Sequence, residues 1–156
     1  MDENNGWVIE GPVDITQFFE ILPDAFPEAT TFFVEGTSME EEVVDCYLKR
    51  LQPGKFLAPS GTFGVSVKIR CIFDKGLFRE LALLSEHHAE PEVLDHLSVY
   101  KGETPLLEWC DAFCNNGQMF LSADLSEERV AAFAKQLKLS YATLESFTKR
   151  LRVGKA

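Results

Sequence analysis

Apolar and polar side chains alternate along several short stretches of the chain, and this period of two is typical of half-buried β-strands. The alternation is cleanest over residues 62–73, where apolar side chains face one way and Thr, Gly, Ser, Lys and Arg face the other. β-Branched and aromatic runs predict further strands over residues 7–10, 30–34, 93–100, 106–113 and 118–121.

A β-hairpin is predicted around residues 101–105, because a short segment containing Gly and Pro separates two of these strand-like runs. If the loop places Tyr100 opposite Leu106, then Leu97 lies opposite Trp109 on the core face of the sheet. The same register sets three more pairs opposite each other: His96 with Cys110, Ser98 with Glu108, and Asp95 with Asp111.

Apolar side chains three and four positions apart predict helices elsewhere in the chain. The first helix follows Asp14, a candidate N-cap, and is expected to end at Pro23. The second is expected to begin with a capping box in which Ser38 is the N-cap and Glu41 the third helical residue. Three more helices are predicted over residues 77–88, from Asp124 or Ser126 to residue 137, and from Ser140 to residue 151.

The order of these elements predicts the fold class. Helical and strand segments are mixed, and neither a repeat nor a linker divides the 156 residues. An apolar fraction of 46% is enough for one core of ordinary size. We therefore predict a single globular domain over residues 1–156 of the α+β class. We expect two layers, a mixed or mainly antiparallel sheet of about five strands with helices packed mainly on one face.

Charge is distributed unevenly along the chain. The net charge is −10, and 12 Asp and Glu residues precede Lys49, which is the first Lys or Arg. Phosphate binding requires cationic surfaces, so this acidic third argues against nucleic-acid binding. We expect it to steer a basic protein partner, or the basic tail of a second copy, with Glu40, Glu42 and Asp45 as the partner-binding residues. Solubility alone is the plainer interpretation, and both a monomer and a homodimer remain open.

The start of the chain and its cysteines predict a cellular compartment. The first six residues lack the basic and apolar parts of a secretory signal, and no uncharged stretch approaches the ~20 apolar residues of a membrane-spanning helix. We therefore expect a cytoplasmic protein that does not enter a membrane. Its four cysteines are expected to be thiols, with Cys110 buried and of ordinary reactivity, and the lack of a CxxC pair argues against a zinc knuckle.

The alternative hypothesis is a small enzyme with its site near the predicted hairpin. An imidazole beside a thiol activates a cysteine nucleophile, which makes His96 and Cys110 candidates, with Glu108 to orient the ring. Two carboxylates in contact can share a proton, which makes Asp95 and Asp111 candidates for acid–base chemistry. Incidental neighbours on a sheet face are the simpler interpretation of both pairs.

Two kinds of ligand site are also open. Lys68 and Arg70 could bind an anion from the polar side of their strand, and His87 and His96 could ligate a metal. Solvated bases and polar side chains at a helix end are the simpler interpretations. No nucleotide-binding or hydrolase motif is present, so no cofactor is expected. The leading hypothesis is a small acidic, non-enzymatic protein that binds a basic protein.

Overall fold

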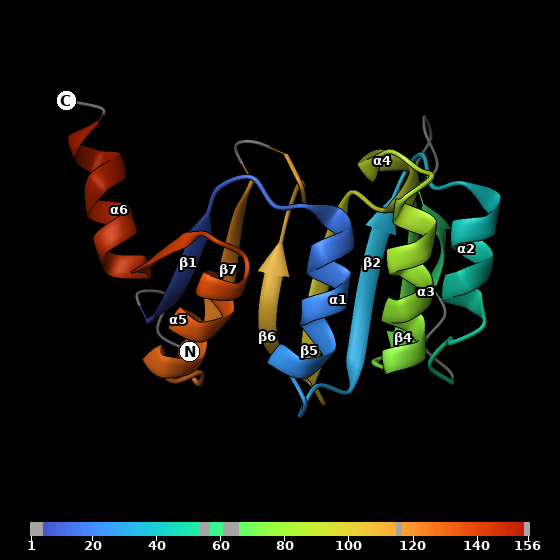
Figure 1. The fold of residues 1–156 in the computed structure, drawn as a ribbon, viewed down its shortest axis with the longest axis horizontal. Helices are drawn as coiled ribbons and strands as arrows, with labels where there is room; N and C mark the ends of the chain where they lie inside the picture. Colours follow the sequence, from blue (N-terminus) through green and yellow to red (C-terminus); the bar gives the residue numbers. More distant parts are fainter. Residues whose placement is uncertain (1–4, 54–56, 61–65, 115–116, 155–156) are drawn as a thin grey trace.

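The computed structural model describes residues 5–53, 57–60, 66–114 and 117–154 (Figure 1). Within these residues eight strands form one sheet in the order β3-β4-β2-β5-β6-β7-β1-β8, and each neighbouring pair is antiparallel. The strands are β1 (Gly6–Glu10), β2 (Thr31–Gly36), β3 (Leu57–Ser60), β4 (Ser66–Ile72), β5 (His96–Lys101), β6 (Thr104–Trp109), β7 (Gln118–Ser122) and β8 (Ser140–Thr143). The predicted α+β class is confirmed, although the sheet is larger than the predicted five strands.

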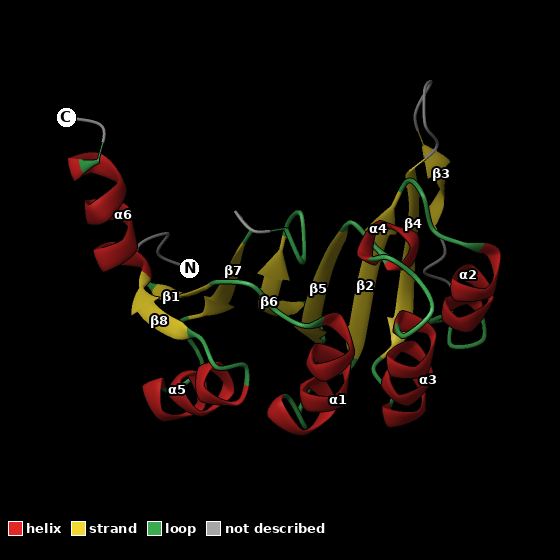
Figure 2. Ribbon diagram, turned by 45° about the horizontal axis from the view of Figure 1, so that its top comes forward, coloured by secondary structure: helices red, strands yellow, loops and turns green. Residues whose placement is uncertain are grey.

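The helices of the described residues are α1 (Ile15–Ala25), α2 (Glu41–Leu48), α3 (Lys75–Ser85), α4 (Glu90–Val93), α5 (Glu127–Gln136) and α6 (Leu144–Val153). Figure 2 shows α1, α3 and α5 along one side of the sheet, whereas α6 rises on the other side at the β1–β8 end. The prediction that helices pack mainly on one face therefore describes α1, α3 and α5 but not α6. None of the helices in the described part of the chain is long and apolar enough to cross a membrane.

Strand alternation gives the sheet two different faces. The face under α1, α3 and α5 carries most of the hydrophobic core, whose strand residues include Phe32, Val34, Ile69, Cys71, Leu97, Val99, Leu107 and Trp109. The other face presents Arg70, Phe33, Ser98 and Glu108, which lie in one row across β4, β2, β5 and β6. We call this second side of the sheet the open face.

The predicted hairpin is present, and its register is confirmed near its base. Leu97 lies opposite Trp109, and Val99 lies opposite Leu107. A bulge after Val99 then shifts the pairing by one residue, so that Tyr100 faces Pro105 and the predicted pairing with Leu106 is wrong. The turn itself requires a left-handed backbone, which Gly102 adopts with a φ of 60°.

Helix α1 begins as predicted but extends further. The Asp14 carboxylate accepts a hydrogen bond from the Gln17 N–H at 2.8 Å and caps the helix. The helix then continues through Pro23 instead of ending there. A proline removes a single backbone donor, and in this last turn the loss is offset because Leu22 and Phe26 are buried in the core.

Helix α2 does not begin with the predicted capping box. Its N-cap is Glu40, and no side chain caps it, so Ser38 and Glu41 do not play the expected roles. The Glu40 N–H instead donates to the carbonyl oxygen of Glu92, at 2.9 Å, in the segment that forms α4. A contact between distant parts of the chain has replaced the local cap.

The C-terminal segment also differs from its predicted helical start. Residues 140–143 form strand β8, which pairs with β1 through Trp7 and Thr143, and α6 begins only afterwards. Strand β1 thereby lies between β7 and β8 in the sheet. The strand predicted over residues 93–100 begins later, at His96, because residues 90–93 form α4. The strand predicted over residues 62–73 corresponds to β4, and its first residues, 62–65, lie outside the described residues.

Candidate functional site

Much of the predicted acidic third is neutralised by bases from later in the chain. Glu10 pairs with Arg150 and Glu28 with Arg129, both at 2.7 Å. Two further pairs join Asp24 to Lys75 at 3.3 Å and Glu35 to Lys68 at 3.9 Å. Among the carboxylates of this third that lie in the described residues, four are thus paired with Lys or Arg from later in the chain, and the excess of negative charge is confined to the others.

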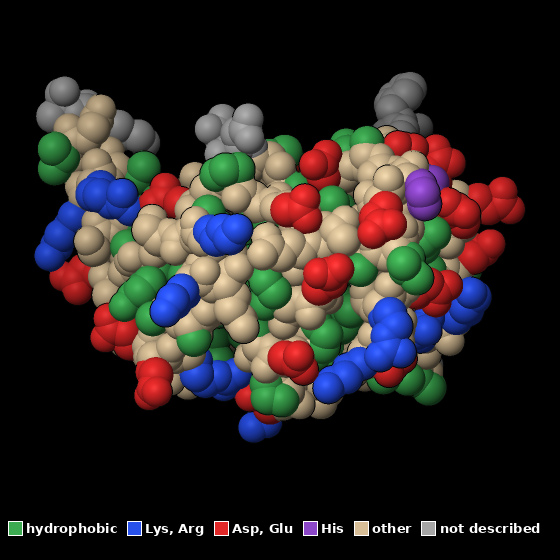
Figure 3. All heavy atoms as spheres, in the orientation of Figure 1, with side chains coloured by type: hydrophobic (Ala, Val, Ile, Leu, Met, Phe, Trp, Pro, Cys, Tyr) green, Lys and Arg blue, Asp and Glu red, His purple; other side chains and the backbone are tan. Residues whose placement is uncertain are grey.

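The remaining excess is concentrated where α2 meets α4. We define the acidic surface as the carboxylates of Glu40, Glu41, Glu42, Asp45, Glu90 and Glu92. In Figure 3 red side chains gather around the single purple histidine at this end of the molecule. The surface joins two segments that are about fifty residues apart, and two hydrogen bonds hold them together. The Glu40 N–H donates to the Glu92 carbonyl, and the Tyr47 hydroxyl donates to the Val93 carbonyl, both at 2.9 Å.

The α4 half of the acidic surface is fixed by local contacts. The Glu92 carboxylate accepts a hydrogen bond from the Ala89 N–H at 2.9 Å, and Pro91 occupies the first turn of the short helix. The Ala89 N–H holds the pKa of Glu92 below its usual value, with a smaller contribution from His88. Glu92 is therefore an ionised, positioned member of the surface at neutral pH.

His88 is the basic side chain that lies within the acidic surface. Its Nε2 lies within hydrogen-bond distance of Glu42, and its Nδ1 is 3.7 Å from Glu92. The hydrogen bond with Glu42 raises the pKa of the imidazole above its usual 6.5, and Glu92 adds to the effect. His88 therefore bridges α2 and α4 by contacting one carboxylate from each.

These contacts predict a pH-dependent stability. A histidine pKa that is raised by folding gives stabilisation that is fully present below the unfolded value of 6.5, and the stabilisation is lost as pH rises through the folded-state pKa. We expect His88→Gln to lower the free energy of unfolding at about pH 6 and to have a smaller effect at about pH 9. Urea denaturation at several pH values measures the difference, with the exposed neighbour His87→Gln as the control. A His88→Gln effect that is constant with pH would contradict the bridge.

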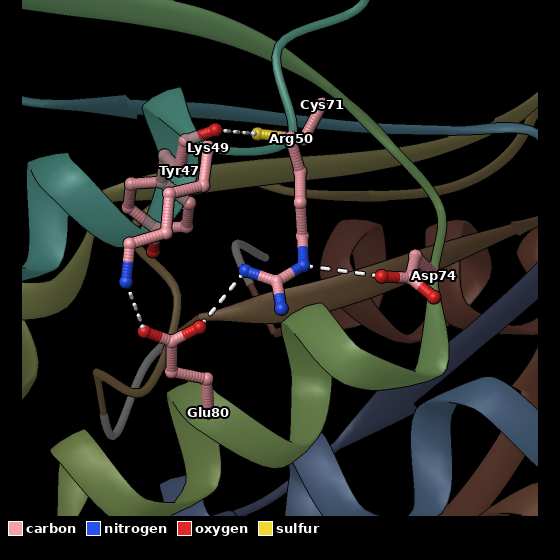
Figure 4. Close-up of polar contacts among 6 residues, drawn as sticks. All are labelled: Tyr47, Lys49, Arg50, Cys71, Asp74 and Glu80. Carbon is pink, nitrogen blue, oxygen red and sulfur yellow. Dashed lines mark hydrogen bonds and ion pairs between the residues drawn. The ribbon is translucent and has the colours of Figure 1, made fainter.

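The nearest bases do not compensate the acidic surface. Lys49 and Arg50 follow α2, but both bind Glu80 of α3, at 3.0 and 2.8 Å, and Arg50 also binds Asp74 at 3.1 Å (Figure 4). The Lys49 ammonium lowers the pKa of Glu80, and the Arg50 guanidinium lowers that of Asp74. Among the described residues, Glu40 and Glu41 at the start of α2 thus have no ion-pair partner, while the bases that follow the helix are held by Glu80 and Asp74.

The residues predicted to bind a partner lie together, and the structure adds other acidic side chains beside them. Glu40, Glu42 and Asp45 all lie on the acidic surface and are exposed. Glu41 was expected to be occupied by its own cap, but its side chain is exposed and makes no cap. Sequence reasoning missed the contribution of residues 88–92, although Pro91 followed by Glu92 is a recognisable helix-start signal.

The residues predicted for an enzyme site do not form one constellation. Nδ1 of His96 accepts a hydrogen bond from the Asp111 N–H at 2.9 Å, and the Asp111 carboxylate is 3.9 Å away. The Asp95 carboxylate is occupied elsewhere, accepting from the N–H and hydroxyl of Thr37 at 2.9 and 3.1 Å. Asp95 and Asp111 therefore have different partners. Glu108 is exposed on the open face, on a groove to which His96 does not contribute.

Cys110 is exposed, so the prediction that it is a buried thiol is wrong. Strand β6 ends at Trp109, and a turn follows in which Asp111 and Phe113 have left-handed φ values of 50° and 68°. The turn carries Cys110 out of the sheet ladder in which it was expected to face His96. The buried thiols are Cys46 and Cys71, and burial raises the pKa of each to about 12, which makes them poor nucleophiles.

Lys68 and His96 have polar partners of their own, whereas the buried Nε of Arg70 has no hydrogen-bond partner among the described residues. Lys68 pairs with Glu35, and the Arg70 guanidinium lies 5.3 Å from the centre of the Tyr100 ring. His87 is exposed and His96 binds the Asp111 backbone, as described above. Across the described residues, no three His, Cys, Asp or Glu side chains are grouped as a metal site would require.

Comparisons of the chain with protein-family models, with curated proteins and with solved structures gave no match.

Proposed function

We propose that this chain is a non-enzymatic, cytoplasmic binding protein that engages a basic protein partner through the acidic surface. One observation carries the proposal: six carboxylates from two distant segments converge, and among the described residues His88 is the one basic side chain that pairs with any of them. The bases that could have neutralised them, Lys49 and Arg50, are bound by α3. Solubility alone does not require acids from separate segments to be fixed side by side.

The charges are held on a supported scaffold, which favours recognition over simple solvation. Tyr47, wholly buried, ties α2 to the α4 segment, and Val43 and Cys46 anchor α2 in the core. Fixed charges of one sign raise the local potential and accelerate the encounter with an oppositely charged protein. Such a surface contributes mainly to the association rate and is sensitive to salt.

Charge reversal tests the proposal. A basic protein is first isolated from a lysate by affinity purification with the unmodified chain. We expect the triple variant Glu40→Lys, Glu41→Lys, Asp45→Lys to bind that protein with an association rate reduced about tenfold or more at low ionic strength, and less as salt is added. Glu42 is left unchanged because it holds His88. Surface plasmon resonance at several salt concentrations separates the association rate from the dissociation rate.

A matched variant controls for total charge. Glu103, Asp124 and Glu128 are exposed and lie outside the acidic surface, so reversing all three to Lys changes the net charge equally. We expect this control to bind nearly as the unmodified protein does. Equal losses in both variants would show a general charge effect, and no loss in the first variant would refute the proposed function.

A further inference from the structure

An apolar groove lies on the open face, at the opposite end of the sheet from the acidic surface. It has a volume of about 220 Å³ and runs over β6, β7 and β1 to the start of α6. Leu106, Phe120 and Leu144 line it, and Phe120 is 40% exposed. An exposed aromatic side chain in an apolar depression is a feature of contact surfaces.

Helix α6 extends this apolar surface away from the sheet. Leu144, Phe147 and Leu151 are three and four residues apart, so they follow one side of the helix. The base of this stripe is packed, since Phe147 is 7% exposed and the centre of its ring lies 6.4 Å from the centre of the Phe120 ring. Its far end is not packed, since Leu151 is 51% exposed. Figures 1 and 2 show α6 projecting beyond the body of the sheet.

The groove and the helix end carry opposite charges. Glu108 lies on the groove and is exposed, and the last turn of α6 contains Arg150 and Arg152. Arg150 is engaged with Glu10 of the same chain. In the described part of the chain, neither Glu108 nor Arg152 makes an ion pair.

We propose that this region is a homodimer interface, in which the end of α6 from each copy packs into the apolar groove of the other. Leu151 would enter the groove, and Arg152 would pair with Glu108 of the second copy. The groove and the protruding helix lie next to each other on one chain. A two-fold axis that places α6 of one copy in the groove of the second therefore also places α6 of the second copy in the groove of the first. These two equivalent contacts close the dimer.

This dimer goes beyond the proposed function and does not depend on it. Helix α6 and helix α2 lie at opposite ends of the molecule (Figure 1), so the acidic surface of each copy would stay accessible.

Sedimentation velocity of the full chain from about 1 to about 200 μM covers the affinities expected of such a dimer. We expect the unmodified chain to dimerise and Leu151→Asp to weaken the dimer about 100-fold, because each of two buried contacts contributes about a factor of ten. Leu83→Asp is the matched control, since Leu83 is 61% exposed on α3, on the other side of the sheet. It should leave association unchanged.

A charge exchange tests the orientation without altering the apolar contacts, and it remains informative if Leu151→Asp perturbs folding. Glu108→Arg and Arg152→Glu are each expected to weaken the dimer, and the double variant is expected to restore it because the ion pair is re-formed with reversed signs. A chain that is monomeric over the whole range would overturn the proposal. So would a dimer that tolerates Leu151→Asp, that responds equally to Leu83→Asp, or that the double variant fails to restore.

Discussion

Replacing Trp109 by alanine is expected to lower the free energy of unfolding by about 3–5 kcal/mol, the range for deleting a buried large aromatic side chain. Trp109 is 1% exposed at the end of β6, where the sheet meets α1. The centre of its ring lies 5.3 Å from the ring centre of Phe18 and 4.6 Å from that of Phe113. The substitution therefore removes one side of an aromatic cluster and leaves a cavity that the neighbouring rings cannot fill without moving.

Urea denaturation followed by circular dichroism measures this loss, and the slope of free energy against urea should stay nearly constant. Phe120→Ala is a suitable comparison, because Phe120 lies opposite Glu108 in the same pair of strands but is 40% exposed on the open face. We expect a clearly smaller loss for that variant. Comparable losses for both variants would contradict the central position of Trp109 in the core.

The second large effect is expected from Tyr47→Phe, which removes a single oxygen atom. Tyr47 is wholly buried, and its hydroxyl donates to the Val93 carbonyl at 2.9 Å. Phenylalanine fills the same space but leaves that carbonyl without its donor, so we expect a loss of about 1–3 kcal/mol. Because this bond ties α2 to α4, the loss should also loosen the acidic surface.

Hydrogen exchange detects that loosening directly. The Glu40 N–H, bonded to the Glu92 carbonyl, should exchange faster in Tyr47→Phe than in the unmodified protein. Tyr141→Phe is the matched control, because the Tyr141 hydroxyl bonds the Glu127 carboxylate at the surface, where water can replace it. Its expected cost is below about 0.5 kcal/mol. Slow exchange at Glu40 in Tyr47→Phe would show that other contacts hold the two segments together.

The sequence was most informative where structure depends on neighbouring residues. The period of two predicted β4 and the hairpin of β5 and β6, and Asp14 and Ser126 were recognisable caps. It was least informative where distant segments compete with local signals. The capping box at Ser38 is locally sound, yet the Glu92 carbonyl takes the Glu40 N–H and moves the start of the helix. Likewise β8 forms only because β1 offers it a partner.

The same limit applies to the candidate site. Glu40, Glu42 and Asp45 could be proposed from local charge, because they are neighbours in sequence. Their companions Glu90 and Glu92 could not, since only the folded chain brings α4 to α2. The sequence also overestimated the extent of the acidic surface, because it could not show which distant bases pair with these acids. Arg129 and Arg150 are remote in sequence, and each neutralises an acid of that third.

The position of β1 between β7 and β8 has a consequence for how the chain reaches its native state. Each neighbour of β1 lies more than about a hundred residues further along the chain, so its pairing closes a very long loop and is expected to be slow. During synthesis Val8 and Ile9, both buried in the finished sheet, have no strand to pair with until residues 118–143 have left the ribosome. Of the eight described strands, the one made first is thus among the last to be buried.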